Sequence, residues 1–339
     1  MKNAGEIQPL KKKMSILLAA FAALFIVCFF SIGMGSVEAT PSEILAVLTG
    51  RIVDSTKVGI ILNIRLPRII TGVIVGMNLS VAGVLLQGIL RNPMASPNII
   101  GVNAGAGLAA ILIMTFFPGK IALITPFSFL GALFSAMLIF VLSVGTANQY
   151  GKTVQIVLAG MAVTALFNAI TNGVMMLNSD VLDVTFSWTL GSLSGRSWSA
   201  VEMILPYCLL GLGAALFLSP RLNLFELGDE LAGSVGLQTG FYRMVFVILA
   251  ALLAGSAVAA AGTIGFIGLI APHIARLMIG SDHRFLLPLS ALLGGVLLVI
   301  SDTLARTVFQ PVELSVGIVT ATLGAPFFLY LMKRNKKNS

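Results

Sequence analysis

The sequence predicts an all-α polytopic membrane protein with about ten transmembrane helices and both chain ends inside the cell. Three observations predict this fold class. Hydrophobic residues make up 57% of the 339 residues and charged residues only 10%, whereas a soluble domain carries about 25% charged residues. Apolar runs of about 20 residues, long enough to cross roughly 30 Å of hydrocarbon as helices, recur along the whole chain. Basic residues gather in the short segments between these runs and in the two tails.

The first apolar run follows a basic N-terminal tail, residues 1–13, and covers about 14–34. It is longer than the apolar part of a signal peptide, and no convincing small-residue cleavage site follows, so we expect an uncleaved first span. Thr40-Pro41-Ser42-Glu43 then predicts the start of a short helix on the outer surface, since Pro fits the first turn of a helix.

The remaining spans are predicted from the alternation of apolar runs and polar turns. Two turns are marked by Pro118-Gly119-Lys120 and by Asn148-Gln149-Tyr150-Gly151-Lys152. We expect nine further spans at about 66–88, 99–117, 121–146, 153–177, 199–218, 244–260, 262–276, 285–308 and 314–332. The longest charged interval, 219–243, and a basic tail, 333–339, complete the chain.

Glycine is abundant, with 35 residues. Pairs such as Gly72 and Gly76, four residues apart, let neighbouring helices approach closely in lipid, so packing is the first interpretation. The run Gly262-Thr-Ile-Gly265-Phe-Ile-Gly268 has a second interpretation, since it could break or shorten the eighth span.

The distribution of charge predicts the orientation. Ten spans place both termini on one side, and two thirds of the 21 Lys and Arg residues, including both basic tails, fall on that side. Most of the 13 acidic residues fall on the other side. Because Lys and Arg in short loops mark the cytoplasmic side, both termini are predicted to lie inside. The formal charge of +8 is therefore explained by topology, and no nucleic-acid partner is expected.

The span centres contain amides and lack charged residues. The polar side chains there are mainly Asn78, Asn103, Asn168 and Asn172. Asp302 and Arg306 lie toward the outer end of the ninth span. Proton-coupled carriers usually hold an ionisable residue within the membrane, so a secondary carrier is the less favoured alternative. If the chain transports, we expect a separate ATPase to supply the energy by docking on the interval 219–243.

Enzymatic or cofactor chemistry is not indicated. Gly151-Lys152-Thr153 resembles the end of a phosphate-binding loop, but the glycine required five residues earlier is Thr146 and no strand precedes it. An intramembrane enzyme would need a buried nucleophile beside a base, and none is evident. The two cysteines and two histidines have no metal-ligand spacing, so no metal or cofactor is expected. His273 is interpreted as part of a Pro–His corner at a helix end.

Seven stretches between residues 60 and 332 form a specific set in a fixed order. They are Arg65-Leu-Pro-Arg68, 87–95, 98–107, Trp188-Thr-Leu-Gly-Ser-Leu193, 262–276, Asp282-His283-Arg284 and 317–328. Together they resemble the FecCD family of permeases, which belong to ATP-binding-cassette importers of ferric siderophores, haem and cobalamin.

This resemblance implies a fold and a complex. The importer permease (type II) fold has ten helices per subunit, and two permease subunits, identical or paralogous, surround a central pathway. Two cytoplasmic ATPase subunits and an extracytoplasmic substrate-binding protein complete the importer. The chain would be a single transmembrane permease domain, 1–339, in the bacterial cytoplasmic membrane, without enzymatic activity of its own. Its expected substrate is a ferric siderophore, with cobalamin or haem as alternatives.

The resemblance also assigns residues at the two membrane surfaces. On the outer side, Arg65, Arg68 and Arg306 match arginines that pair with glutamates of the binding protein. The alternative for these residues is a local role, such as an interface anchor or an ion pair between Asp302 and Arg306 at helical i,i+4 spacing. On the inner side, Asn92 and Met94 match a cytoplasmic gate after the second span, and the alternative there is an ordinary helix end.

For ATPase coupling, the resemblance places two short helices in residues 226–236, here named the coupling stretch. The residues assigned to coupling are Glu226, Leu227, Gly228, Asp229, Glu230, Leu231, Ala232 and Gly236. Acidic residues near the start of the first helix suit its dipole. Gly233-Ser234 departs from the bulkier, often basic pair that is common in the family, which bears on the choice of ATPase partner.

Overall fold

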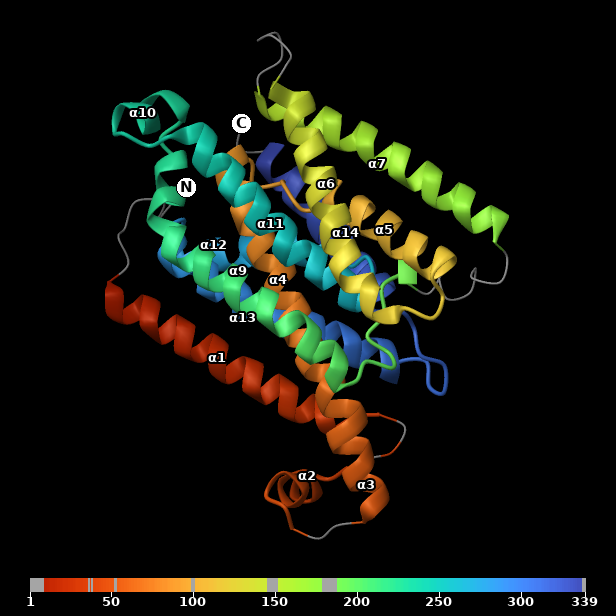
Figure 1. Ribbon diagram of the computed structural model, residues 1–339. Helices are drawn as coiled ribbons and strands as arrows, with labels where there is room; N and C mark the ends of the chain where they lie inside the picture. Colours follow the sequence, from red (N-terminus) through yellow and green to blue (C-terminus); the bar gives the residue numbers. More distant parts are fainter. Residues whose placement is uncertain are drawn as a thin grey trace.

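The computed structural model describes residues 9–35, 37, 39–51, 54–98, 101–144, 152–178 and 188–336. Helices form all the regular secondary structure in these residues, and most of them run alongside one another in a single oblique bundle (Figure 1). Residues 148–151 of the second predicted turn and the interval 179–187 lie outside the described residues, whereas Lys152 and Thr153 begin helix α7 (Lys152–Leu177).

Six helical segments of the described chain are long and apolar enough to cross a membrane. They are α1 (Leu10–Gly33), the segment Ser55–Leu90 that ends in α4 (Leu66–Leu90), α7 (Lys152–Leu177), α9 (Trp198–Phe225), α11 (Thr239–Ala261) and α13 (His283–Thr307). Shorter apolar segments lie in α5 (Val102–Phe116), α6 (Ile124–Val144, preceded by the 3-10 turn Ile121–Leu123), α12 (Ile267–Ile279) and α14 (Val316–Lys336). The prediction of an all-α protein with about ten membrane-spanning helices is confirmed.

Helix α4 lies at the centre of the bundle. It packs against α13, α11, α9 and α12, and every residue from Asn78 to Leu90 is buried. Glycine permits the closest approaches, since a Cβ at Gly76 would lie 2.3 Å from the carbonyl oxygen of Gly294 in α13. The packing role predicted for Gly76 is therefore confirmed.

The outer end of the bundle carries α2 (Pro41–Leu48) and α3 (Ser55–Gly59), which project beyond the other helices (Figure 1). The predicted helix start at Thr40 is confirmed by a capping box. The Thr40 hydroxyl accepts from the Glu43 N–H, and the Glu43 carboxylate accepts from the Thr40 N–H at 2.9 Å. Helix α3 continues through a π-helical turn (Ile60–Arg65) into α4, so Arg65-Leu-Pro-Arg68 lies within one continuous helical segment.

The predicted boundaries of the interval 219–243 are wrong at both ends. Helix α9 continues through Pro220 to Phe225, because Leu222 and Phe225 are buried against the bundle and packing outweighs the missing N–H of the proline. Helix α11 begins at Thr239 rather than near residue 244. The connection between them therefore comprises residues 226–238.

The eighth span is shortened, as the glycine run suggested. Residues 262–265 are not helical, and α12 begins only at Ile267. Gly262 has φ 71°, and a Cβ there would lie 2.0 Å from the carbonyl oxygen of Trp188, so only glycine fits this approach. His273 lies inside α12, and its ring meets the Phe327 ring edge-on with 5.9 Å between the two ring centroids. The predicted Pro–His corner at a helix end is therefore wrong.

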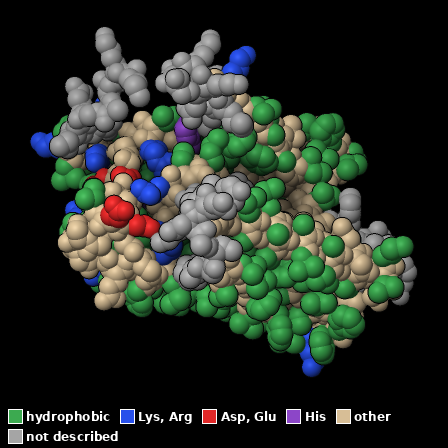
Figure 2. Space-filling model, turned by 90° about the horizontal axis from the view of Figure 1, so that it is seen from above, with side chains coloured by type: hydrophobic (Ala, Val, Ile, Leu, Met, Phe, Trp, Pro, Cys, Tyr) green, Lys and Arg blue, Asp and Glu red, His purple; other side chains and the backbone are tan. Residues whose placement is uncertain are grey.

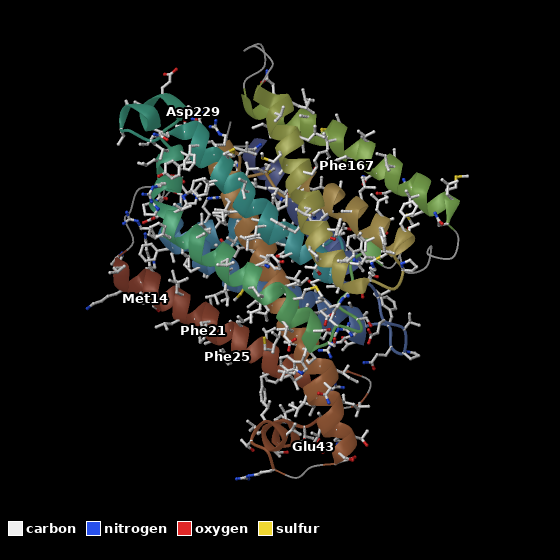
Figure 3. All side chains as sticks on the ribbon, in the orientation of Figure 1. Met14, Phe21, Phe25, Glu43, Phe167 and Asp229 are labelled. Carbon is white, nitrogen blue, oxygen red and sulfur yellow. The ribbon has the colours of Figure 1, made fainter. Side chains whose placement is uncertain are left out.

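The surface of the bundle divides into apolar sides and charged ends. Phe21 and Phe25 on α1 are 51% and 64% exposed and lie on an open side of the bundle (Figure 3). Figure 2 shows the end that carries α10, where Lys, Arg, Asp and Glu side chains gather in one part of the view. An apolar belt between charged ends is the surface expected of a protein that crosses a bilayer.

Candidate functional site

Two of the outer arginines close the C-terminal end of α1. Arg65 is 5% exposed, and its Nη1 donates to the carbonyl oxygen of Ile32 at 2.7 Å. Arg306, also 5% exposed, donates from Nη1 to the carbonyl oxygen of Met34 at 2.8 Å and from Nη2 to Ser31 Oγ at 2.7 Å. Helix ends leave carbonyl groups without intrahelical partners, and these two arginines supply the missing donors.

The third outer arginine joins α4 to α13 and to the loop that follows α13. Arg68 donates three hydrogen bonds to Asp302, from Nε to Oδ2 at 3.0 Å and to Oδ1 at 3.2 Å, and from Nη2 to Oδ1 at 2.9 Å. Its Nη1 donates to Glu313 at 2.9 Å. Arg306 Nε lies 3.8 Å from Asp302 Oδ2, which confirms the expected i,i+4 pair. Sequence reasoning missed Arg68 as the closer partner of Asp302, because 234 residues separate them.

The outer end therefore holds a buried charged cluster, formed by Arg65, Arg68, Asp302 and Arg306. The sequence placed the three arginines on one side of the membrane, and the structure brings them together in this cluster. All three are also at least nine-tenths buried and bonded within the chain. Glu313, with its side chain 45% exposed, is the member of this network that reaches the surface. Docking of a binding protein on the arginines stays a prediction.

On the inner side, α4 ends in a hydrogen-bonded turn, residues 91–95, here named the gate corner. Arg91 ends the helix in the left-handed region, with φ 48°. The Asn92 N–H donates to the carbonyl oxygen of Gln87 at 3.1 Å, and the Met94 N–H donates to Asn92 Oδ1 at 2.9 Å. The corner is thus a helix end in its geometry, and its gating role stays a prediction.

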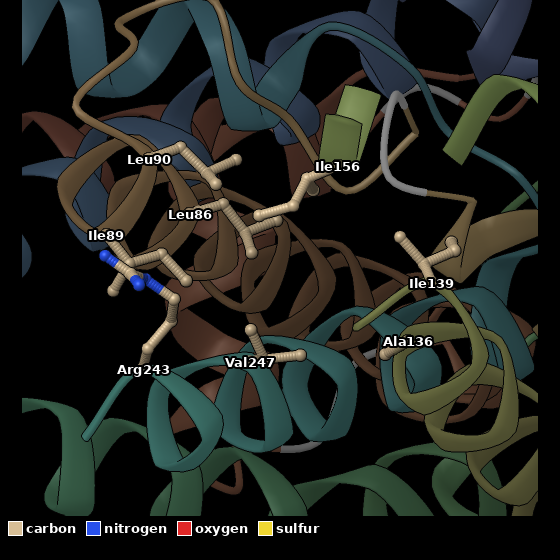
Figure 4. Close-up of a pocket in the computed structure, with 8 residues that line it drawn as sticks. All are labelled: Leu86, Ile89, Leu90, Ala136, Ile139, Ile156, Arg243 and Val247. Atoms are coloured by element: carbon tan, nitrogen blue, oxygen red, sulfur yellow. The ribbon is translucent and has the colours of Figure 1, made fainter. Parts of the chain in front are cut away.

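A small apolar cavity lies just before the gate corner, between α4, α6, α7 and α11 (Figure 4). It is lined by Leu86, Ile89, Leu90, Ala136, Ile139, Ile156, Arg243 and Val247. Arg243 is the one charged residue among these eight. Its Nη2 donates to Asp229 Oδ1 at 2.7 Å, so the same side chain touches the cavity and the coupling stretch.

The coupling stretch contains one short helix, α10 (Asp229–Ser234), where the resemblance implied two. Gly228 and Gly236, with φ of 96° and 91°, allow the chain to turn on either side of α10. The next helical turn belongs to α11, which begins at Thr239 and continues into the bundle. A separate second helix is therefore not present, because that segment is continuous with a span.

The coupling stretch presents an apolar row to its surroundings. Leu227, Leu231 and Val235 follow one another at intervals of four residues and are 50%, 60% and 65% exposed, while Ala232 is buried. The stretch lies at the opposite end of the bundle from α2, beyond the ends of the neighbouring helices (Figures 1 and 3). Val235 was missed in the sequence, although its four-residue spacing from Leu231 was a usable signal.

The mid-span amides separate into two groups. Asn78 is fully buried and donates to Ser256 Oγ at 3.1 Å, and Asn103 is 5% exposed. Asn168 and Asn172 are instead exposed, four residues apart on α7. An exposed amide at membrane depth is costly against lipid, so this face of α7 is suited to water or another protein.

Comparisons with known proteins agree with this architecture. The FecCD transport family matches residues 23–334. An Fe(3+)-citrate import system permease protein of Bacillus subtilis, YfmE, is 39% identical, over 95% of this chain and 96% of its own. A hemin transport system permease protein of Yersinia pestis, HmuU, is 42% identical, over 81% and 84% of the two chains. The structure also resembles a chain described as an inward-facing conformation of a putative metal-chelate type ABC transporter, with a TM-score of 0.84 and 30% identity over 94% of this chain and 99% of that one. With a bundle of about ten apolar helical segments in the described residues and a family match over nearly its whole length, this chain is a member of the FecCD transport family.

Proposed function

We propose that the chain is the transmembrane permease subunit of an ATP-binding-cassette importer that carries a ferric siderophore across the bacterial cytoplasmic membrane. The observation that carries this proposal is a bundle of six long and four shorter apolar helical segments, whose coupling stretch exposes Leu227, Leu231 and Val235 beyond the helices. Apolar side chains exposed to water in a row mark a surface that a partner covers.

The partners follow from this proposal. A pair of cytoplasmic ATPase subunits would cover the coupling stretches of two permease subunits, identical or paralogous. ATP hydrolysis would take place on the ATPase subunits, and movement of the coupling stretch would open and close the gate corner at Asn92 and Met94. Alternating access of this kind requires no covalent chemistry in the permease.

We also propose that an extracytoplasmic binding protein docks on the outer end, at Arg65, Arg68 and Arg306. Because the guanidinium groups already have partners within the chain, acidic residues of the binding protein would have to share or replace those partners. Arg65→Gln should weaken binding of the loaded binding protein to the assembled importer, measured as a dissociation constant. Unchanged affinity, with the variant complex assembled normally, would remove Arg65 from the docking surface.

The substrate proposal is supported by the relatives. Those from Bacillus subtilis are named for Fe(3+)-citrate and iron(3+)-hydroxamate import. Others at similar identity are named for hemin and for cobalamin, which keeps haem and cobalamin as the alternatives. All of these are bulky chelates, so discrimination among them depends on pathway and binding-protein contacts rather than on the fold.

A transport assay tests the proposal. The permease is reconstituted in proteoliposomes with its ATPase and binding protein, with ATP on the α10 side, and offered radiolabelled ferric citrate, a ferric hydroxamate, hemin or cobalamin. We expect ATP-dependent uptake of a ferric chelate, and no uphill movement by the permease alone. Uptake of hemin or cobalamin only would reassign the substrate. Uphill uptake without ATPase and nucleotide would overturn the ATP-driven assignment.

A further inference from the structure

The last turn of α4 contacts α9, α12 and α13, close to the coupling stretch. Gln87, 3% exposed, is at the centre of these contacts. Its Nε2 donates to the carbonyl oxygen of Gly268 at 3.2 Å, and its Oε1 accepts from Arg276 Nη2 at 3.1 Å. One amide is therefore held at both ends by α12, through the first turn of that helix and through its last.

The backbone of the same residue holds the gate corner. The carbonyl oxygen of Gln87 accepts from the Asn92 N–H at 3.1 Å, and the Asn92 side chain in turn accepts from the Met94 N–H at 2.9 Å. A shift of Gln87 relative to α12 therefore changes the position of Asn92 directly, through one hydrogen bond and without any intervening element.

The first residue of the coupling stretch, Glu226, lies within electrostatic reach of Arg276. Burial raises the pKa of the Glu226 carboxyl, the positive charge of Arg276 opposes this rise, and Asp282 adds to it. The groups around Glu226 also include His283, whose Nδ1 lies 3.9 Å from Glu226 Oε1. Glu226 is the first residue of the coupling stretch, so its approach to His283 connects that stretch to the ring that packs against the last turn of α4 at Gly88.

A second contact joins the gate corner directly to the coupling stretch, without α12. The Arg91 guanidinium lies against the backbone of Gly228, so that a Cβ on Gly228 would be 3.0 Å from Arg91 Nη1. A third runs through Gly88, where a Cβ would lie 3.1 Å from Nε2 of the buried His283. His283 Nδ1 is 2.7 Å from Asn223 Oδ1, in the turn of α9 that leads into the coupling stretch. The final turn of α4 is therefore held from three directions.

We propose that Gln87 and Arg276 are positioning residues that make the gate corner follow the coupling stretch during ATP-driven transport. This inference rests on the proposed function and assigns it a route. It runs from Glu226 through His283 to the last turn of α4, where Arg276 holds the Gln87 side chain and the Gln87 carbonyl holds Asn92. Neither residue need touch the substrate or the nucleotide. Loss of either should leave hydrolysis running while the gate corner responds less often to each cycle.

The test measures uptake and ATP hydrolysis in the same proteoliposomes, with the fully assembled importer and the ferric citrate, ferric hydroxamate, hemin or cobalamin that the wild type carries. Gln87→Met and Arg276→Met remove the hydrogen bond while keeping a long side chain. Gln87→Glu keeps an acceptor for Arg276, and Arg276→Lys keeps a cationic donor. Arg221→Met is the matched control, since its guanidinium packs over the Phe217 and Tyr242 rings at 5.9 and 5.3 Å instead.

We expect both Met variants to hydrolyse ATP near the wild-type rate while uptake per ATP falls about tenfold, within the range typical of coupling between sites. Gln87→Glu and Arg276→Lys should lie closer to the wild type, and Arg221→Met should match it. The double variant Gln87→Met/Arg276→Met should be no worse than either single variant, because both break one path.

Two results would overturn the inference. One is unchanged uptake per ATP in the Met variants, and the other is a parallel loss of hydrolysis and uptake, which a merely structural role would produce. Should a Met variant fail to assemble, Gln87→Asn withdraws the amide from Arg276 while staying polar and gives the same readout. Absence of ATP-dependent uptake in the wild type would instead count against the proposed function.

Discussion

Arg68 and Asp302 are the residues whose pairing decides the structure of the outer end. Both side chains are almost fully buried, at 9% and 3% exposed, and they join α4 to α13 through three hydrogen bonds. A buried ion pair adds little net stability relative to apolar residues, but removal of one partner leaves a charge without compensation. The pair therefore acts as a constraint on how these two helices meet.

Arg68→Gln should lower the free energy of unfolding by about 3–5 kcal/mol, because Asp302 is left buried beside only the more distant Arg306. Thermal or denaturant unfolding of the purified protein in detergent micelles measures this. The double variant Arg68→Gln/Asp302→Asn should recover most of the loss. Lys57→Gln, which breaks a partly exposed ion pair with Glu43, is the control and should change little. Equal stability of Arg68→Gln and wild type would show that Asp302 finds another partner.

Glu43 gives a pH-dependent cap on α2. A hydrogen bond from Lys57 Nζ at 2.7 Å, with further bonds from Thr40, lowers the pKa of Glu43 from its usual 4.5 to about 2. The pKa of Glu43 is lower in the folded state than in the unfolded chain. The stabilisation of α2 by the ionised Glu43 is therefore complete above about pH 4.5 and is lost as the pH falls toward 2. Hydrogen–deuterium exchange of α2, corrected for intrinsic rates, should therefore be faster at pH 3 than at pH 5. In Lys57→Gln, which lacks the hydrogen bond that lowers the pKa of Glu43, the rise in the exchange rate of α2 should begin nearer pH 4.5. Equal protection at both pH values would contradict the prediction.

Among the elements, α7 differs most from the central helix α4. Every residue of α4 between Asn78 and Leu90 is buried, whereas α7 exposes Met161, Leu166 and Ile170 together with two amides. An apolar helix with an exposed polar stripe is expected where a membrane helix meets water or a polar ligand on one side. The face with Asn168 and Asn172 is therefore the best candidate on α7 for contact with the transported chelate.

Asn168→Leu and Asn172→Leu should each lower ATP-dependent uptake about fivefold, if each amide donates or accepts one hydrogen bond worth about 1 kcal/mol in the pathway. Assembly and ATP hydrolysis should be retained, since neither side chain is part of the buried core. Ile170→Leu, a volume-conserving change on the same helix, is the matched control. Unaltered uptake in both Asn variants would show that this face of α7 lies outside the pathway.

At the scale of the whole molecule, charge and shape agree on an orientation. The α2 end and the α10 end lie at opposite extremes of the bundle (Figure 1), and basic residues are concentrated on the side of α10. Lys and Arg are retained on the cytoplasmic side during insertion, so α10 is placed inside and α2 outside. This agrees with the proposed docking of ATPase and binding protein at opposite ends.

Single cysteines test this orientation in a variant without Cys28 and Cys208. Ser42 on α2 and Ser234 on α10 are both exposed. In intact cells, a membrane-impermeant maleimide should label Ser42→Cys and leave Ser234→Cys unlabelled until the membrane is opened. Labelling of Ser234→Cys in intact cells would invert the topology and remove the coupling stretch from the cytoplasm.

The sequence alone determined the class of fold, the number of spans, their orientation and the family. These properties depend on local quantities: the length of an apolar run, the charge of a short loop, or the order of short motifs. The helix start at Thr40 and the shortened eighth span were predictable for the same reason, since capping and glycine effects act within a few residues. Predicted helix ends were wrong where packing overrode a local signal. At Pro220, for example, α9 continues because Leu222 and Phe225 are buried.

Only the tertiary structure decided which side chains meet. Arg68 and Asp302 are 234 residues apart, and Gln87 and Arg276 are 189 apart, so no local pattern indicates either pairing. Burial of the outer arginines and exposure of Asn168 and Asn172 likewise depend on which face of each helix the neighbours cover. Hydrophobicity places a helix in the membrane but leaves its rotation open, and that rotation is set by close packing against the other helices.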